Sequence, residues 1–520
     1  MKSAGWRRCF LLLILLPTLL ACGAERRVVV EVDGGSKVIM TQATTVRQVL
    51  AEAGVQLGEI DRVEPDLWEE VGRSATIVVT RIDEETVVEY RTIPFERKVV
   101  KDEAVPEGEA RMVQLGVNGQ EVSTYLVRYE DGREVERQLL GTEVLEEPQA
   151  EVVLVGVQGS IPTVPIEGTV AYISNGNAWV MRQSSTNKRP LTFAGDLDGR
   201  VFDLSPDGRY LLFTRRPTVG GAAGLTGPLN SLWVVDTLIV GEEPRPLGLD
   251  GVLYGEWSFD GKRFAYSTAE RTPGAPGWKA HNDLWIAPLD GGEGVQVLPS
   301  SSQQLYSWWG TTYVWSPDGL RFAYARPDEV GIIDLEAWER RPLLTFAPYH
   351  TYSEWVWTPT VTWSPDSRYL ATVVHGPPLG DETPEESKAF DIWVLSVDGQ
   401  IQAQLVSQAG MWASPTWSPP RWDSSGQLVD LITYGQAQYP ADSQNCRYDL
   451  YVMDGDGSNR RQLFPFAQGG GLAMPQAAWS PQGDQLIVEH EGNLYLVGLH
   501  DGGVRALTRD GASSYARWSQ

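Results

Sequence analysis

The chain has 520 residues, of which 68 are acidic and 43 are basic, so its formal net charge at pH 7 is -25. This excess of acid argues against nucleic-acid binding, which requires basic patches facing phosphates. The length exceeds that of one ordinary domain, so we expect several domains along the chain.

The first segment, residues 1–21, has the features of a secretory signal peptide. Three basic residues precede an apolar run over residues 9–20, which is short for a membrane span. The run ends at Leu20-Ala21-Cys22, which resembles a bacterial lipobox. The resemblance implies lipidation of Cys22, a short tether over residues 22–27, and attachment to a bacterial membrane on its extracytoplasmic side. The alternative is an ordinary signal peptide followed by a chance cysteine.

The three cysteines also decide whether the mature chain can form an internal disulfide. Cys9 would leave with the signal peptide and Cys22 would carry lipid. Cys446 would then stand alone, so the mature chain can form no internal disulfide.

Residues 28–82 predict a small α+β domain. Residues 28–32 and 75–80 have the composition of strands, and residues 45–53 read as a helix that Thr44 or Thr45 caps and Gly54 ends. The stretch from Leu50 to Pro65 resembles the domain of unknown function that precedes G5 domains in cell-wall proteins such as resuscitation-promoting factors.

Residues 83–157 predict an extended β module. Asn118-Gly119 and Asp131-Gly132 have hairpin-turn chemistry between thin, polar strands. With residues 93–95, 113–119 and 125–129, this segment resembles a G5 domain. The resemblance implies a flat module associated with binding the amino sugars of cell walls or biofilms; the alternative is a spacer. Residues 158–168 then form a linker that contains two prolines.

A short phrase returns seven times after residue 168, with successive copies 39 to 62 residues apart. Its full form, Trp-Ser-Pro-Asp-Gly, stands at 315–319, and the other copies begin at positions 204, 257, 363, 417, 479 and 518. A full unit holds four short β-type runs separated by Gly, Asp and Pro. Four strands per repeat and no helix-period run predict a β-propeller in a mainly β protein.

The two ends of this region predict how the ring closes. Residues 170–174 match the strand that follows the phrase, and residues 515–519 match the strand that carries it. Joined, they complete one blade, which gives a seven-bladed propeller over residues 169–520. Closure also removes open sheet edges. Six blades is the fallback, because the unit from 479 to 518 is short.

The repeated phrases resemble those of the TolB-type propeller family over about two-thirds of the chain. The copy at Trp417 departs by an insertion in its first turn rather than by a lost strand. The resemblance implies that the strand ending in Trp-Ser is innermost, with short turns on one face of the propeller and long loops on the other.

Motifs for catalysis and for metals are missing from the sequence. The five histidines show no His-Glu-x-x-His spacing, and neither a Cys-x-x-Cys pair nor a Gly-x-Ser-x-Gly elbow occurs. Residues 454–458 look like a calcium loop, but the twelfth position is Pro465 rather than glutamate, so we interpret them as a hairpin turn. We expect no metal and no cofactor, and we favour a non-catalytic protein over an enzyme.

Aromatic residues outside the repeated phrase gather in the long loops. We predict a ligand-binding surface there, against the alternative that these side chains only cover loop cores. The predicted ligand contacts are Trp308, Trp309, Tyr349, Tyr352, Trp355 and Trp412.

These features together predict an envelope-anchored binding or scaffold lipoprotein. Its expected partner is a cell-wall polymer, a glycan or an envelope protein, recognised through the propeller and the G5-like module. The rival hypothesis is a carbohydrate-active hydrolase or lyase that uses carboxylates at the channel mouth, such as Glu354 and Asp381.

Overall fold

The computed structural model describes residues 25–156, 162–217, 227–290, 292–302, 306–422, 428–465 and 470–520. The predicted signal peptide and Cys22 lie outside the described residues. The chain divides into two compact units, Met1–Arg97 with Gln114–Glu151 and Lys98–Val113 with Val152–Gln520. Within the described ranges, no helix combines the length and the apolar character that crossing a membrane requires.

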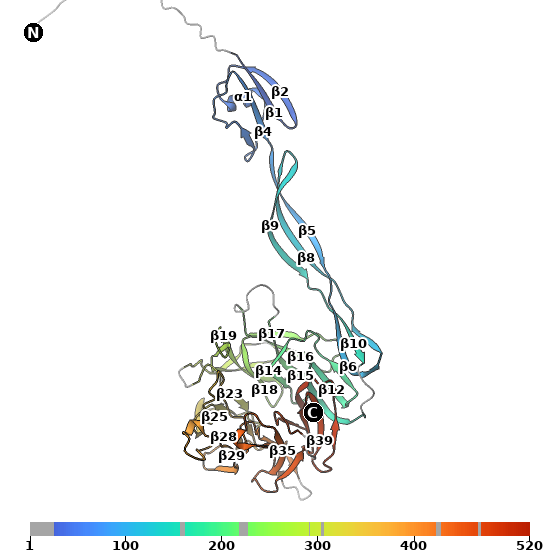
Figure 1. The fold of residues 1–520 in the computed structure, drawn as a ribbon, viewed down its shortest axis with the longest axis vertical. Helices are drawn as coiled ribbons and strands as arrows, with labels where there is room; N and C mark the ends of the chain where they lie inside the picture. Colours follow the sequence, from blue (N-terminus) through green and yellow to red (C-terminus); the bar gives the residue numbers. More distant parts are fainter. Residues whose placement is uncertain are drawn as a thin grey trace, which may run out of the picture. The chain divides into compact units, whose positions relative to one another are not determined.

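The first unit begins with a four-stranded sheet that carries one helix (Figure 1). The strands, in sheet order, are β2 (Gly35–Thr41), β1 (Arg26–Val32), β4 (Ser74–Thr80) and β3 (Arg62–Glu64), and the helix is α1 (Val46–Ala53). Thr45 caps the helix and Gly54 ends it in the left-handed conformation, with φ of 73°. Val46, Val49 and Leu50 are buried against the sheet. The predicted α+β element order is therefore confirmed.

The second sheet of this unit consists of long, thin strands. Their order is β5 (Ile82–Ile93), β8 (Gly119–Glu130) and β9 (Arg133–Glu146). Every residue of β9 is exposed, and on β8 the only fully buried apolar side chain is that of Val127. This sheet has no core of its own, as the polar faces of the sequence predict.

The second unit begins with three strands and continues into the propeller region. The three strands are β6 (Arg97–Glu107), β10 (Glu151–Gly156) and β7 (Ala110–Gln114), in the sheet order β6-β10-β7. Val105 and Leu154 pack in one hydrophobic cluster with Tyr172 and Trp179 of the propeller region.

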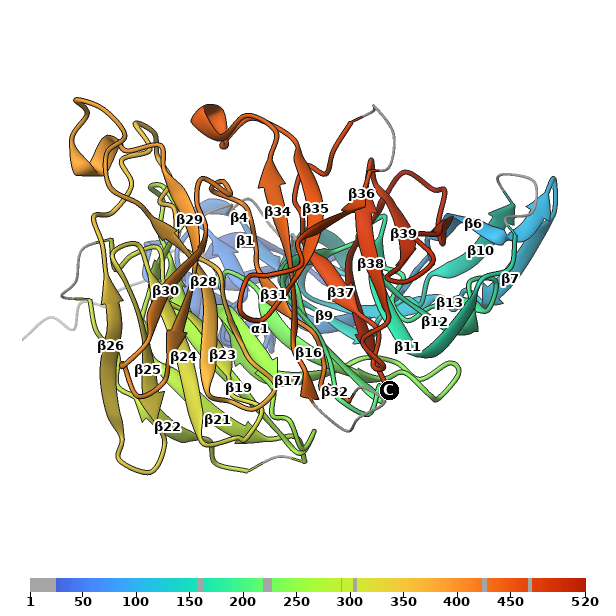
Figure 2. The same ribbon diagram turned by 90° about the horizontal axis from the view of Figure 1, so that it is seen from below.

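Among the described residues from 165 onward, seven sheets follow one another, each with four strands along its main path (Figure 2). The first sheet holds β13 (Lys188–Pro190), β12 (Asn177–Ser184), β11 (Pro165–Ser174) and β41 (Ser513–Ser519). The second sheet holds β14 (Leu197–Leu204), β15 (Tyr210–Arg215), β16 (Ser231–Asp236) and β17 (Arg245–Asp250). The third sheet holds β18 (Val252–Trp257), β19 (Arg263–Arg271), β21 (Leu284–Pro288) and β22 (Val295–Leu298), with β20 (Trp278–Ala280) paired to β19.

The fourth sheet holds β23 (Thr312–Trp315), β24 (Arg321–Arg326), β25 (Glu329–Asp334) and β26 (Glu339–Thr345), and the fifth holds β27 (Val361–Trp363), β28 (Tyr369–His375), β29 (Phe390–Ser396) and β30 (Gln402–Val406). The sixth sheet holds β31 (Thr416–Trp417), β34 (Leu431–Ala437), β35 (Tyr448–Asp454) and β36 (Arg461–Phe464). The seventh sheet holds β37 (Ala477–Trp479), β38 (Gln485–His490), β39 (Asn493–Gly498) and β40 (Val504–Ala506). Two short helices, η1 (Pro384–Glu386) and η2 (Pro440–Asp442), lie in loops. A small hairpin of β32 (Arg421–Trp422) and β33 (Leu428–Val429) flanks the insertion predicted from Trp422 to Gly426, of which residues 423–426 lie outside the described residues.

The first and last strands of the propeller region pair with each other, as the sequence predicts. Strand β11 pairs antiparallel with β41, from Thr169 opposite Ser519 to Ser174 opposite Ser513. In Figure 2 the C-terminus accordingly lies beside β11. The seven-bladed ring stays a prediction, which this pairing and the count of sheets support.

The repeated phrase is a hydrogen-bonded turn. In the copy at 315–319, the Ser316 hydroxyl donates to Asp318 at 2.5 Å and accepts the backbone N–H of Arg321 at 2.9 Å. Gly319 takes a left-handed conformation, with φ of 74°. The next tryptophan, Trp363, donates its indole N–H to the carbonyl of Val314, in the preceding sheet, at 3.0 Å. The phrase therefore shapes each turn and joins neighbouring sheets.

Candidate functional site

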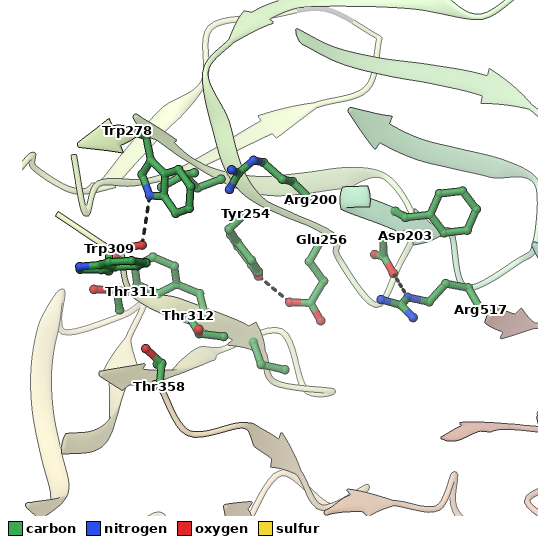
Figure 3. A pocket seen from close by; sticks show the side chains of 16 residues that line it. Arg200, Asp203, Tyr254, Glu256, Trp278, Trp309, Thr311, Thr312, Thr358 and Arg517 are labelled. Carbon is green, nitrogen blue, oxygen red and sulfur yellow. Dashed lines mark hydrogen bonds and ion pairs between the residues drawn. The ribbon is translucent and has the colours of Figure 1, made fainter. Parts of the chain in front are cut away.

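A cavity of about 460 Å³ lies among the inner strands of the propeller region. Residues of β14, β18, β23 and β41 line it, together with Trp278 of β20 and with Trp309 and Thr358 from the loops (Figure 3). Its position follows from the fold, because the strand that begins each repeat is the innermost strand of its sheet.

Two carboxyl groups from neighbouring sheets face this cavity. Asp203, near the end of β14, accepts the backbone N–H of Trp257 at 2.9 Å. Glu256, on β18, accepts the Tyr254 hydroxyl at 2.5 Å and the backbone N–H of Trp315 at 2.8 Å. Each carboxylate thus holds the backbone of the following sheet while it faces the cavity.

The surroundings of these two carboxyl groups raise their pKa values. Burial raises the pKa of Glu256 to about 8, with a further contribution from the charge of Asp203; the hydrogen bonds from Tyr254 and Trp315 act against the shift. Burial also raises the pKa of Asp203, opposed by the charge of Arg517. At neutral pH Glu256 therefore carries a proton for most of the time.

Two arginines and two tryptophans complete the wall of the cavity. Arg517, on β41, places its Nε 4.0 Å from Asp203. The guanidinium of Arg200 lies 4.1 Å from the ring centre of Trp278, a cation–π geometry. Trp278 and Trp309 meet edge to face, with ring centres 6.0 Å apart, and the Trp278 indole donates to the Trp309 carbonyl at 3.3 Å. Figure 3 shows these groups around one space.

The charged groups are unevenly distributed around the inner strands. The residue immediately before the first residue of each phrase copy is, in chain order, Asp203, Glu256, Val314, Thr362, Thr416, Ala478 and Arg517. Only three of these seven are ionisable, and those three belong to consecutive sheets once β41 is counted with the first sheet. Since the other four copies keep the fold without a charge here, the repeat itself does not require one. Sequence reasoning did not single out these residues, although an alignment of the seven copies exposes them.

A second cavity, of about 500 Å³, is lined in part by tryptophan and proline side chains of the repeated phrases. Trp363, Trp417, Trp479 and Trp518 take part in its wall. Arg517 lines both cavities, so it stands between a polar compartment and an apolar one.

The six predicted ligand contacts fall into two groups. We call Trp278, Trp308 and Trp309 the first aromatic group. Trp309 lines the polar cavity, and Trp308 is 47 % exposed with the Lys279 ammonium 5.7 Å from its ring centre. Trp278, which sequence reasoning placed in a long loop without choosing it as a contact, belongs to this group.

The other four, Tyr349, Tyr352, Trp355 and Trp412, form the second aromatic group. Trp355 and Trp412 pack together with ring centres 5.8 Å apart, and with Tyr349 they lie partly buried against a hydrophobic core. Tyr352 is 69 % exposed, stacks on His350 and donates its hydroxyl to Glu386. Three of the four therefore also have a packing role. Thr358, at the edge of the polar cavity, lies in the same loop as Trp355.

The carboxylates proposed for the rival hypothesis lie elsewhere. Glu354 and Asp381 are exposed loop residues, and neither lines the polar cavity. Residues 454–458 form the hairpin turn between β35 and β36, with the Asp454 N–H donating to the Ser458 carbonyl at 2.9 Å. Within the described part of the chain, no three His, Cys, Asp or Glu side chains are grouped as metal ligands.

Comparison with known domain families identifies the first part of the chain. Residues 84–158 match the G5 domain, and residues 28–67 match the G5-linked ubiquitin-like domain. Both resemblances drawn from the sequence are thereby confirmed. No curated protein matches the chain in sequence.

Several solved structures resemble the chain in fold. The putative TolB from Agrobacterium tumefaciens is 18 % identical over 68 % of this chain and 100 % of its own, with a TM-score of 0.33. TolB from Acinetobacter baumannii is 13 % identical over 84 % of this chain and 100 % of its own, with a TM-score of 0.35. The tricorn protease is 11 % identical over 76 % of this chain and 43 % of its own, with a TM-score of 0.44.

The chain therefore contains a G5 domain, and seven sheets with four strands each along their main path follow it among the described residues.

Proposed function

We propose that this chain is an envelope-anchored binding protein whose propeller holds a cell-wall glycan at the polar cavity. The observation that carries the proposal is the wall of that cavity, where Trp278 and Trp309 stand beside hydroxyl, carboxyl and guanidinium groups. Such a wall suits a sugar, because ring C–H faces pack on aromatic rings while the hydroxyls find hydrogen-bond partners.

The two aromatic groups favour a polymer over a single sugar. Thr358 lines the cavity, and Trp355, three positions earlier in the same loop, belongs to the second aromatic group. A chain of several sugars that enters the cavity could therefore extend along this loop. The G5 domain, with its flat and fully exposed β9, would offer a further contact or hold the propeller away from the membrane.

Binding of envelope polysaccharides to the full chain in detergent tests this proposal. We expect Trp309→Ala to weaken the binding of the glycan that is retained by about tenfold, as for an aromatic residue at the centre of a site. Trp338→Ala is a matched control, because Trp338 is 51 % exposed on the β25–β26 turn and lines neither cavity. Equal losses in both variants, or retention of envelope proteins but of no glycan, would contradict the proposal.

The raised pKa of Glu256 supports a second candidate function, glycan hydrolysis or elimination. A carboxyl group that is protonated near pH 7 can donate a proton to a leaving group, and the neighbouring Asp203 could act as its carboxylate partner. This pair replaces Glu354 and Asp381 as the carboxylates to test.

Product release from the retained glycan separates the two functions. If the chain is an enzyme, Glu256→Gln should lower turnover by about 10²- to 10⁴-fold, the usual worth of a general acid, while the glycan stays bound. A wild-type chain that holds the glycan without releasing shorter products is a binding protein.

A further inference from the structure

His375 lies between the loop that carries Tyr349, Tyr352 and Trp355 and the loop that carries Glu386, the partner of Tyr352. His375 ends β28 and is only 3 % exposed. Its Nδ1 lies 2.7 Å from the carbonyl oxygen of Ala347, in the loop before β27. Its Nε2 lies 2.7 Å from the carbonyl oxygen of Ser387, in the loop before β29.

These two contacts specify the protonation of the ring. A carbonyl oxygen can only accept a hydrogen bond, and a neutral imidazole has one N–H and one lone pair. With both nitrogens facing carbonyls, only the doubly protonated ring can donate to both. Turning the ring over would bring carbon atoms to the carbonyls and would satisfy neither.

Three aromatic rings and one nearby carboxyl group surround His375. The rings of Tyr349, Trp357 and Phe390 enclose the imidazole, with centres 5.4, 6.4 and 5.1 Å away. Asp391, on β29, is the nearby carboxyl group; burial raises its pKa, and its hydrogen bond from Gln408 and the charge of His375 act against that shift. Tyr349 is the other titratable group against the ring. Glu386, on η1, is directed to Tyr352 instead.

We propose that His375 is a positioning residue, held as an imidazolium that clamps the loop of residues 346–360 to the loop of residues 376–389. The first loop carries Tyr349, Tyr352 and Trp355 and brings Thr358 to the polar cavity. The glycan surface would therefore keep its shape only while His375 is doubly protonated. The importance of that shape for binding rests on the function proposed above, whereas the protonation of His375 does not.

Rising pH should open this clamp. When one ring proton leaves, a nitrogen lone pair faces a carbonyl oxygen, and the attraction becomes a repulsion. The backbone contact between His350 N–H and the Glu385 carbonyl, at 2.8 Å, joins the same two loops and should weaken with it. The expected result is a more mobile second aromatic group at alkaline pH.

NMR of the full chain with ¹⁵N-labelled histidine tests the protonation directly, because the chain has only five histidines. The signal of His375 is identified by its contacts with the ring protons of Tyr349 and Phe390, so no variant has to fold. We expect both ring nitrogens to carry protons at pH 6. A single neutral tautomer at that pH would overturn the proposal without affecting glycan binding.

Hydrogen exchange of residues 346–360 tests the consequence. After correction for the intrinsic effect of pH, protection should fall about tenfold as His375 loses a proton, the factor expected when one buried hydrogen bond is lost. His375→Gln should abolish this pH dependence. His281→Gln is the matched control, because the ring of His281 contacts the Thr268 hydroxyl, which can either donate or accept. Unchanged protection while His375 titrates would overturn the positioning role.

Discussion

The serine of the repeated phrase shows why a five-residue pattern can specify a whole turn. In four copies its hydroxyl donates to the aspartate two positions later and accepts the backbone N–H five positions later. These serines are at most 3 % exposed, so no solvent competes for either bond. Glycine follows in most copies because the backbone there is left-handed, and Ser367 takes the same conformation with φ of 59°.

Ser316→Ala should therefore destabilise the fold more than an ordinary surface substitution. It removes the partner of the buried Arg321 N–H and of Asp318, at an expected loss of about 1–3 kcal/mol in the free energy of unfolding. Denaturant unfolding measures the loss. Ser353→Ala, at an exposed loop position, is the control and should change stability by less than about 0.5 kcal/mol.

Glu256 should make the stability of the chain depend on pH. Its pKa is about 8 in the folded state and near 4.5 when exposed, so unfolding releases its proton at intermediate pH. The wild type therefore loses stability relative to Glu256→Gln as pH rises from about 4.5 to about 8. The loss is roughly 1.4 kcal/mol for each unit by which the pKa of Glu256 in the folded state exceeds its pKa in the unfolded state. Unfolding of both proteins at pH 5 and pH 8 checks the sign. A wild type that gains stability relative to the variant over this range would contradict the raised pKa.

At the scale of elements, the sequence best predicts those helices and strands that local interactions determine. The helix α1 follows from the Thr45 cap, its buried apolar face and the left-handed Gly54. The pairing of β11 with β41 follows from two half-units that complete each other. Loop conformations do not follow in this way, because contacts from distant loops fix them. Tyr352 meets Glu386, and Trp355 meets Trp412, so the predicted aromatic surface separates into two groups with different packing.

The polar cavity was missed for a related reason. Asp203, Glu256 and Arg517 lie far apart in the sequence, and each looks like an ordinary strand residue. Only the stacking of repeats brings them to one space, so their relation becomes visible when the copies are compared position by position. Motif searches look for fixed spacing along the chain and cannot find such a site.

Deleting residues 513–520 should destabilise the propeller region through its edges. The deletion leaves β11 without its partner and removes the Trp518 indole bond to the Glu167 carbonyl, which measures 2.6 Å. Trp518 is only partly buried, so Trp518→Ala alone should cost less than the roughly 3–5 kcal/mol of a fully buried tryptophan. Thermal unfolding should show a lower midpoint for the deletion than for Trp518→Ala. Identical midpoints for the deletion and the wild type would contradict closure by β41.

At the scale of the whole molecule, the predicted lipidation of Cys22 would give each segment a place in the envelope. A lipid on Cys22 would attach the N-terminus, the G5 domain would follow, and the propeller would present its cavity last along the chain. Removing residues 1–21 takes away three basic and no acidic residues, so the formal charge changes from -25 to -28. Such a chain would gain little from electrostatic attraction to anionic lipids, so its attachment to a membrane would depend on the predicted lipid on Cys22.

Cys22→Ser should therefore release the protein from the membrane or block its processing. One acyl chain holds a protein only weakly, so stable attachment predicts more than one chain on the mature N-terminus, and mass spectrometry of the first peptide can count them. Fractionation of cells that express the wild type, Cys22→Ser or the control Cys446→Ser measures the distribution between membrane and soluble fractions. Cys446 is a partly buried free cysteine of the propeller region, so its replacement should leave the protein in the membrane fraction. A wild type found in the medium, with an unmodified N-terminus, would show that residues 1–21 are an ordinary signal peptide and that the cysteine after them is incidental.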